Sequence, residues 1–230
     1  MRILLVAADP MEFSGMLSLA SDHGPVPIGV HWARCARLGE YDALLIANGV
    51  GQHRSAAAVD AAAEFGPQAV VSTGFCGALD EALDIADLVV ASAIDDGFRH
   101  YPALPIRGPL ETSVGVIRSV DQVARDVEEK ALLRAAGACA VEMEAAGVAR
   151  RAAGLGLPFY CVRAVTDLAE ESLANDFNRA LRPDGHFDTI SILLGALRDP
   201  AVRLPELLRL RSRSVQAARN LGEFFANCRL

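Results

Sequence analysis

The chain has 230 residues, of which 52% are apolar and 22% charged, and its formal net charge at pH 7 is −7. This length suits one good-sized α/β domain, and no apolar run approaches the length of about 18 residues that spans a bilayer. The first apolar run, residues 3–8, is too short for a signal-peptide core and is followed by Asp9 and Pro10. We therefore expect a cytoplasmic protein.

Cysteines, histidines and charge exclude further classes of function. The five cysteines are dispersed, odd in number and form no C-x-x-C pair, and the histidines show no metal-ligand spacing. We therefore expect no disulfide framework, no metal and no organic cofactor. The acidic balance argues against nucleic-acid binding. Residues 198–230 differ, because they carry seven arginines against only Asp199, Glu206 and Glu223.

Apolar runs alternate with helix-length segments along most of the chain. In chain order, strands are predicted at residues 3–8, 26–30, 43–47, 69–72, 88–94, 114–120 and 159–165. Helices are predicted at 10–20, from 52 to near 65, and at 127–136, 144–155 and 190–197, while 74–77 and 101–109 are predicted loops. This alternation favours a largely parallel sheet covered on both faces. We expect a single domain over residues 1–230, with a basic helical extension from about 198.

Three carboxylic acids lie in apolar segments of the second half of the chain. Glu142 and Glu144 flank Met143 in V-E-M-E-A-A, and Asp167 ends the predicted strand that closes with R-A-V-T-D. Buried acids are costly unless they bind a ligand or hold a proton, so this grouping indicates chemistry. In an extended backbone Met143 would face away from both glutamates, so a shared ligand requires an irregular backbone here.

Four segments of the chain together resemble the superfamily of purine nucleoside phosphorylases and nucleosidases. They are A-D-P-M-E at 8–12, N-G-V-G at 48–51, T-G-F-C-G-A-L at 73–79, and V-E-M-E-A-A paired with R-A-V-T-D. The likeness covers roughly residues 1–180 and is greatest to the 5′-methylthioadenosine/S-adenosylhomocysteine nucleosidases. It implies a three-layer α/β sandwich with a mixed, partly barrel-like central sheet. It also implies a homodimer that binds a small purine nucleoside.

The resemblance also implies roles for individual residues. Asp167 would be the general acid, Glu12 the water-activating carboxylate and Glu144 the ribose-binding carboxylate. The further substrate-binding residues would be Met143, Glu142, Val50, Phe75, Gly77 and Phe177, the last as an aromatic lid over the 5′ substituent. Cleavage of an N-ribosidic bond needs such a set, because the base must be protonated, water activated and positive charge on the sugar stabilised.

Departures from the family pattern indicate whether water or phosphate accepts the ribosyl group, but they do not identify the substrate. Phosphorylases of the superfamily bind phosphate with an arginine and a Ser or Thr where this chain has Asp9, Glu12 and Phe75. A carboxylate repels a phosphate dianion, so we predict hydrolysis with release of adenine, and a phosphate-dependent phosphorylase is the alternative. Val123 stands where an aromatic residue would stack on the base.

Simpler roles compete with each assignment. Glu12 could be an ordinary acid in the first turn of a helix, where the helix dipole stabilises it. Asp167 could cap a helix, and Met143 could be a core residue. A non-catalytic nucleoside-binding module is the alternative from another class. That interpretation is disfavoured because a binding protein needs neither an acid nor a base.

The basic carboxyl-terminal segment interleaves leucines with arginines from Arg203 to Arg213. This ending resembles hopanoid-associated members of the superfamily, which implies adenosylhopane as an alternative substrate. A basic amphipathic helix could lie on an anionic membrane surface. We prefer a surface helix that packs its leucines on the body or on a second subunit.

Overall fold

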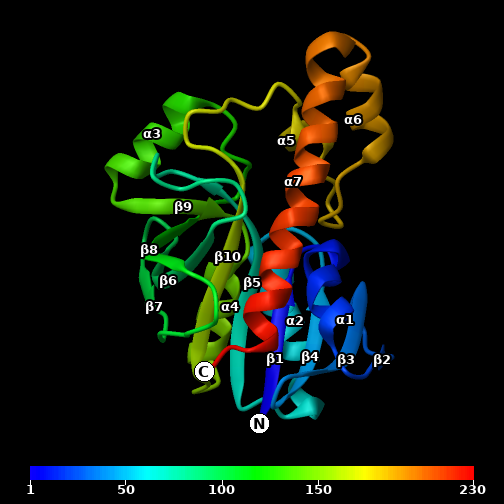
Figure 1. Cartoon of the computed structure of the whole chain (residues 1–230), viewed down its shortest axis with the longest axis vertical. Helices are drawn as coiled ribbons and strands as arrows, with labels where there is room; N and C mark the ends of the chain where they lie inside the picture. The colour runs from blue at the N-terminus through cyan, green and yellow to red at the C-terminus, as the bar shows by residue number, and fades with distance from the viewer.

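The computed structural model describes residues 1–230 as a ten-stranded mixed sheet with helices on both faces (Figure 1). The strands are β1 (Arg2–Ala7), β2 (His23–Pro25), β3 (Trp32–Leu38), β4 (Tyr41–Ala47), β5 (Ala69–Ala78), β6 (Leu88–Asp95), β7 (His100–Pro102), β8 (Thr112–Ser119), β9 (Ala138–Glu142) and β10 (Phe159–Asp167). The α-helices are α1 (Ser14–Leu19), α2 (Gln52–Ala61), α3 (Val127–Ala135), α4 (Ala145–Gly154), α5 (Phe177–Ala180), α6 (Thr189–Ala196) and α7 (Pro200–Ala226), with short 3-10 helices at η1 (Pro10–Phe13) and η2 (Ala63–Phe65).

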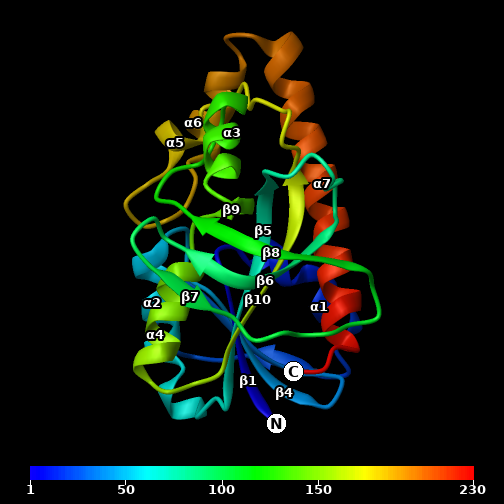
Figure 2. The ribbon, with the colours of Figure 1, turned by 90° about the vertical axis from the view of Figure 1, so that its left-hand side faces the viewer.

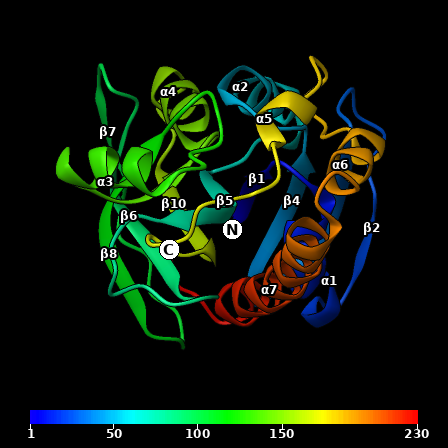
Figure 3. The ribbon, with the colours of Figure 1, turned by 90° about the horizontal axis from the view of Figure 1, so that it is seen from above.

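One half of the sheet closes into a ring of strands. β5 pairs with both β9 and β10, and the ring is completed through β6 and β8. From β5 the sheet continues through β1, β4 and β3 to the edge strand β2 as an open layer. The views in Figures 2 and 3 show the curved half and the open half side by side. The predicted mixed, partly barrel-like sheet is confirmed.

Alternating side chains of the strands supply two separate cores. In β1, Leu4 and Val6 pack into the core that α2 and α4 cover, while Ile3 and Leu5 face the core that α7 and the η1–α1 segment cover. This period of two is what a strand buried on both faces requires. Figure 3 shows the resulting three layers, with α2 and α4 on one face of the sheet and α1 and α7 on the other.

Three sequence predictions were wrong in whole or in part, and the first is the loop at 101–109, whose residues 101 and 102 belong to β7 and pair with β6. Residues 26–30 form no strand: Val26, Ile28 and Val30 do pack on the core, but the nearest strands are β2 and β3. Prolines at 25 and 27 lack the N–H groups that a strand would donate. Residues 74–77 are not a loop, because β5 continues to Ala78 and pairs there with β9 and β10. Tertiary pairing overrides the local glycine signal at this point.

The carboxyl-terminal segment forms one long helix that spans the molecule (Figure 1). Pro200 opens α7, while Pro205 lies inside the helix and does not end it. The distal half of α7 buries Ala217, Leu221 and Phe225. The leucines interleaved with arginines are not buried, since Leu208 is exposed and Leu204, Leu207 and Leu210 are only partly buried, so the preferred packing of these leucines stays a prediction. None of the helices combines the length and apolar character that a bilayer crossing requires.

Candidate active site

A cavity of about 340 Å³ lies at the carboxyl ends of the central strands, where open α/β sheets bind ligands. All the residues that the sequence analysis assigned to the site line this cavity: Glu12, Val50, Phe75, Gly77, Glu142, Met143, Glu144, Asp167 and Phe177. The rest of its wall consists of Ala8, Asp9, Cys76, Val120, Val123, Ala124, Val141, Thr166, Leu173, Gly185, His186, Phe187, Leu210 and Ser214.

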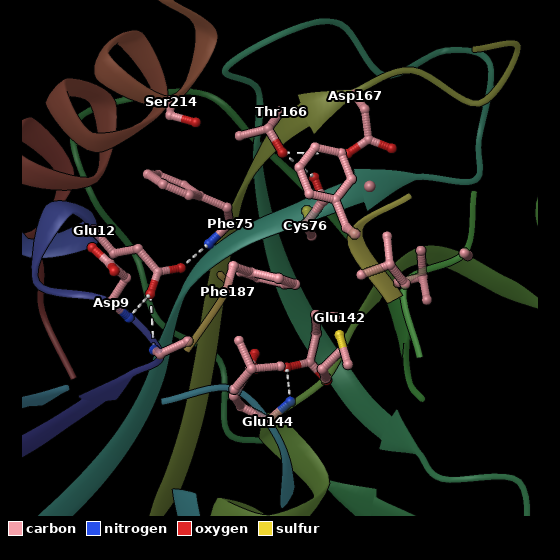
Figure 4. A pocket seen from close by; sticks show the side chains of 18 of the residues that line it. Asp9, Glu12, Phe75, Cys76, Glu142, Glu144, Thr166, Asp167, Phe187 and Ser214 are labelled. Atoms are coloured by element: carbon pink, nitrogen blue, oxygen red, sulfur yellow. Dashed lines mark hydrogen bonds between the residues drawn. The ribbon is translucent and has the colours of Figure 1, made fainter. Parts of the chain in front are cut away.

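Strand β5 sets the spacing between the two ends of the cavity. Register with β10 places Arg163 opposite Gly74 and Asp167 opposite Gly77. A side chain at Gly74 would clash with Glu12 Oε1, and a Cβ at Gly77 would lie 2.8 Å from Asp167 Oδ2. Each glycine therefore marks one acid, and the two glycines lie about 10 Å apart along the extended strand. Figure 4 shows Glu12 and Asp167 on opposite sides of the cavity.

Glu12 is held by backbone N–H groups of two neighbouring strand ends. Its Oε2 accepts hydrogen bonds from the N–H groups of Ala8 and Asp9, each at 2.8 Å, and Oε1 accepts one from Phe75 N–H at 2.7 Å. Burial raises the pKa of Glu12, while Arg163 and the backbone donors oppose this effect. The residue also completes a capping box with Asp9, so its ordinary helix-start role is present as well.

The V-E-M-E segment leaves β9 and turns directly into α4. Glu142 is the last residue of β9, and Glu144 has φ −122° and ψ −37°, outside both strand and helix values. This is the irregular backbone that the sequence analysis required. It lets Met143 and Glu144 line the same cavity.

Glu142 and Glu144 are both buried, but their carboxyl groups differ in how many hydrogen bonds they accept. Glu142 accepts hydrogen bonds from Ser119 Oγ at 2.6 Å and from the Glu144 and Ala145 N–H groups at 2.8 and 2.7 Å, and it pairs with Arg163. This carboxylate is saturated and fixes the start of α4. Glu144 accepts only a 3.2 Å hydrogen bond from Gly51 N–H, so it retains acceptor capacity for a ligand.

Arg163 is fully buried among three carboxyl groups. It pairs with Glu142, its Nη1 lies 3.5 Å from Glu144 Oε2, and its charge also acts on Glu12. Its Nε and Nη1 have no hydrogen-bond partner. Burial raises the pKa of Glu144 to about 8, with Arg163 opposing the shift and the other two glutamates adding to it. One guanidinium therefore serves three acids.

Asp167 is paired with the only lysine in the sequence. Lys130 Nζ, on α3, donates to Asp167 Oδ2 at 2.6 Å and to the carbonyls of Leu168 and Glu171 at 2.7 and 3.1 Å. Burial raises the pKa of Asp167, and the lysine opposes that shift. No helix begins after Asp167, so the helix-cap alternative for this residue was wrong.

Aromatic residues close one side of the cavity. Phe177 opens α5 and meets Phe187 edge to face, with 5.9 Å between ring centroids. The carboxamide of Asn178 joins both polar groups of Val123: it accepts from Val123 N–H at 2.7 Å and donates to Val123 O at 3.0 Å. These contacts tie α5 to the cavity wall.

Sequence reasoning missed Arg163, Lys130 and Phe187 as members of the site. Arg163 carried a signal, since an arginine inside an apolar strand needs buried acidic partners. Lys130 carried none, because V-E-E-K-A-L-L-R reads as an ordinary amphipathic helix. Phe187 lies in an irregular segment and reaches the cavity only through the fold.

The cavity wall contains acidic residues but no arginine or lysine. Five acidic residues line the cavity and no arginine or lysine does, because Arg163 and Lys130 lie behind the acids that they contact. No three His, Cys, Asp or Glu side chains are arranged to hold a metal ion. The arrangement suits a neutral or cationic ligand with hydroxyl groups better than a phosphate dianion.

Comparison with known proteins assigns the family. The chain belongs to the Phosphorylase superfamily, which it matches over residues 2–184. It is similar to a 5′-methylthioadenosine/S-adenosylhomocysteine nucleosidase of Staphylococcus aureus strain JH9, with 29% identity over 147 residues. That match covers 51% of this chain and 64% of the relative, which is less than two thirds of the relative's length.

Solved structures share the fold. The nucleosidase of S. pneumoniae bound to the transition-state inhibitor MT-ImmA has a TM-score of 0.72, 18% identity and 99% coverage of both chains. Futalosine hydrolase of Helicobacter pylori strain 26695 has a TM-score of 0.68, 21% identity and 96% coverage of both chains. The same fold therefore accompanies two different substrate names, and α7 lies beyond the residues that match the family.

Proposed function

We propose that this protein is a purine nucleosidase that hydrolyses the N-ribosidic bond of an adenine nucleoside of the methylthioadenosine or adenosylhomocysteine type. The observation that carries the proposal is the presence of Glu12, Glu144 and Asp167 in one cavity, with Glu12 packed against Gly74 and Asp167 against Gly77 of β5. The S. aureus relative supports the substrate class, while the futalosine hydrolase neighbour keeps the 5′ substituent open.

The carboxyl groups divide the chemistry between them. Asp167 gives its proton to a purine nitrogen as the C–N bond breaks and its electron pair moves to the base. Glu12 takes a proton from the water that attacks the sugar carbon from the opposite face, and its raised pKa makes it a stronger base. Their placement on opposite sides of the cavity suits an acid and a base that act on opposite faces of one sugar, as in inverting glycoside hydrolysis.

Glu144 binds the ribose hydroxyl groups in this proposal. Its carboxyl group has few partners in the protein, and hydroxyl donors would favour its ionised form. Glu142 acts differently from the role first expected, since its saturated carboxylate positions the backbone of Glu144 and does not reach for the sugar. Met143 packs beside the sugar from the same turn.

Water is the proposed acceptor because the cavity offers phosphate no cation. Phe75 contributes its backbone N–H to Glu12, and its side chain occupies the wall where a hydroxyl residue would bind phosphate. Phosphorolysis would place a dianion among five acids. We further propose a cytoplasmic homodimer.

Adenine release in phosphate-free buffer tests the function. The wild-type chain should release adenine from methylthioadenosine and adenosylhomocysteine without phosphate. Asp167→Asn should lower kcat about 1,000-fold, the range of a lost general acid, while nucleoside-dependent thermal stabilisation remains. Strict dependence on phosphate would identify a phosphorylase, and stabilisation without any product would identify a binding module.

A longer apolar 5′ substituent, as in adenosylhopane, is a second candidate. Leu210 and Ser214 of α7 line the cavity although they lie outside the residues that match the family. An adenosine series with 5′-alkyl groups of increasing length separates the candidates. A kcat/KM that rises with chain length favours the lipid-like substrate, and a steady fall excludes it. Liposome flotation with and without residues 200–230 tests the associated membrane contact.

A further inference from the structure

Lys130 is the single lysine among 22 basic residues, and its side chain is only 1% exposed. A buried ammonium is costly unless it is paired and fully hydrogen-bonded. All three of its protons are used, on Asp167 Oδ2 and on the carbonyls of Leu168 and Glu171. It therefore has no donor left for a ligand, and any influence on the reaction must pass through Asp167.

The lysine sits behind the acid as seen from the cavity. Asp167 lines the cavity, whereas Lys130 does not. Oδ2 accepts the hydrogen bond from Lys130 Nζ on the side of the carboxyl that packs against Gly77, and the other oxygen, Oδ1, accepts a 3.3 Å hydrogen bond from Thr166 Oγ1. The ion pair thus fixes the rotation of the carboxyl group and leaves Oδ1 as the oxygen that is free of the lysine.

We propose that Lys130 is a positioning residue that orients Asp167 and neutralises the carboxylate left behind when the proton has moved to the purine. This inference rests on the proposed function. Before transfer, the proton is on Asp167; afterwards it is on the base nitrogen, and the C–N electron pair has left with the base. The new carboxylate then forms a buried ion pair, so proton transfer creates no unpaired charge in the wall.

A compact ammonium suits this position better than a guanidinium. Lysine provides three donors from one atom, which here reach one carboxylate and two carbonyls of the same loop, whereas arginine provides a planar fork. The other charged or titratable groups that act on Asp167 are Glu171 from the same loop, Arg213 from α7 and Cys76 from β5. Glu171 and Arg213 form an ion pair with each other, at 2.6 Å.

The pH profile of the variant Lys130→Met tests the proposal. Activity should fall on the alkaline side of the profile, where Asp167 loses its proton. Without the lysine the pKa of Asp167 rises, so this alkaline limb should move up by about one pH unit, while plateau kcat falls about 10-fold because the acid is weaker. Lys130→Arg keeps the charge and should hold the limb within about 0.3 pH units of wild type. A loss of activity that is equal at every pH, with no shift of the alkaline limb, would overturn the proposal.

The leaving group separates proton transfer from a structural defect. A ribosyl substrate that leaves as p-nitrophenolate needs no protonation, so Lys130→Met should cleave it within about threefold of the wild-type rate. An equal loss on both substrates would assign Lys130 a merely structural role in the 168–171 loop.

A measurement without turnover separates this inference from the proposed function. Because there is one lysine, protein labelled with 13C,15N-lysine gives a single Nζ signal. Its chemical shift should titrate with Asp167, and the step should vanish in Asp167→Asn. A step without any adenine release would defeat the proposed function alone. Adenine release without a step would defeat this inference alone.

Discussion

The two ends of the cavity balance charge in different ways. At the base end one carboxyl, Asp167, meets one ammonium whose three donors are all used. At the sugar end Glu12, Glu142 and Glu144 share Arg163, and two nitrogens of that guanidinium have no hydrogen-bond partner. The base end has one cation for its one acid, while the sugar end has three acids for one cation.

This difference matches the charge that each end would meet in the proposed reaction. The sugar becomes positive as the bond breaks, and a surplus of carboxylates fixed in place stabilises that charge without reorganisation. The cost appears at Glu144, where burial raises the pKa of the carboxyl group to about 8. The base end needs no surplus, since its task is to move one proton.

Removal of Arg163 should have the largest effect, because it leaves three buried acids without a cation. We expect Arg163→Met to lower the free energy of unfolding by about 3–5 kcal/mol, measured by urea denaturation at pH 7. Arg37→Met is the matched control: Arg37 forms an exposed ion pair with Asp42 and should cost at most about 1 kcal/mol. Equal losses in the two variants would contradict the comparison.

The pH dependence of stability should be nearly as large. The pKa of Glu144 is about 8 in the folded protein and near 4.3 in an unfolded chain, so the folded state holds the extra proton between these values. Stability should therefore fall as pH rises from 5 to 8. Glu144→Gln should remove about 3 kcal/mol of that fall. Denaturation midpoints at the two pH values check this, and an unchanged slope in the variant would show that Glu144 is already ionised.

The two glycines of β5 allow each end to be disturbed separately. Gly74 has φ +131° and its Cβ would displace Glu12, so Gly74→Ala should lower kcat about 100-fold. Gly77→Ala crowds Asp167 at 2.8 Å and should lower kcat less, with a shifted alkaline limb. Steady-state kinetics over pH 5–9 distinguishes the two. Identical profiles would mean that the ends are not independent.

The aromatic pair Phe177 and Phe187, the proposed lid, should give the smallest effect, because an apolar side chain neither gives nor takes a proton in the proposed reaction. Phe187→Ala should raise KM about 10-fold and leave kcat within about threefold, the pattern of lost uniform binding. Phe187→Leu retains apolar bulk and should raise KM less. A large fall in kcat would place the lid in the chemical step and not in substrate retention.

Much of the fold could be predicted from the sequence because most elements have local signals. The apolar runs that became β1, β4, β6, β8 and β10 were identified, as were the helices that begin after Asn48–Gly51 and after Glu144. The continuation of β5 through Gly74–Gly77 could not be, since it depends on partners far away in the chain. Glycine there reflects the two acids packed against it, not a turn.

The candidate site, like the fold, could be predicted from the sequence only in part. Glu142, Glu144 and Asp167 were identifiable because carboxyl groups in apolar segments are unusual, whereas Glu12 was identifiable only through the family resemblance. Their counterions were harder to find: Arg163 lies within a recognised segment, but Lys130 comes from a helix 37 residues away from Asp167. Which cation neutralises which acid is decided by the closure of the sheet, and no local pattern encodes it.

The strand β5 belongs to both the closed ring and the open layer: β1 pairs with it at 69–72, β9 at 77–78, and β10 from Val70 to Gly77. Glu12 on η1 and Asp167 on β10 both pack against this strand, at Gly74 and Gly77, whereas α5 and α6 are attached by loops. In the proposed function, substitutions in α5, α6 or the aromatic residues would change which nucleoside enters, while the distance between the acid Asp167 and the water-activating Glu12 stays constant. Such a division would let new substrate preferences evolve without rebuilding the chemistry.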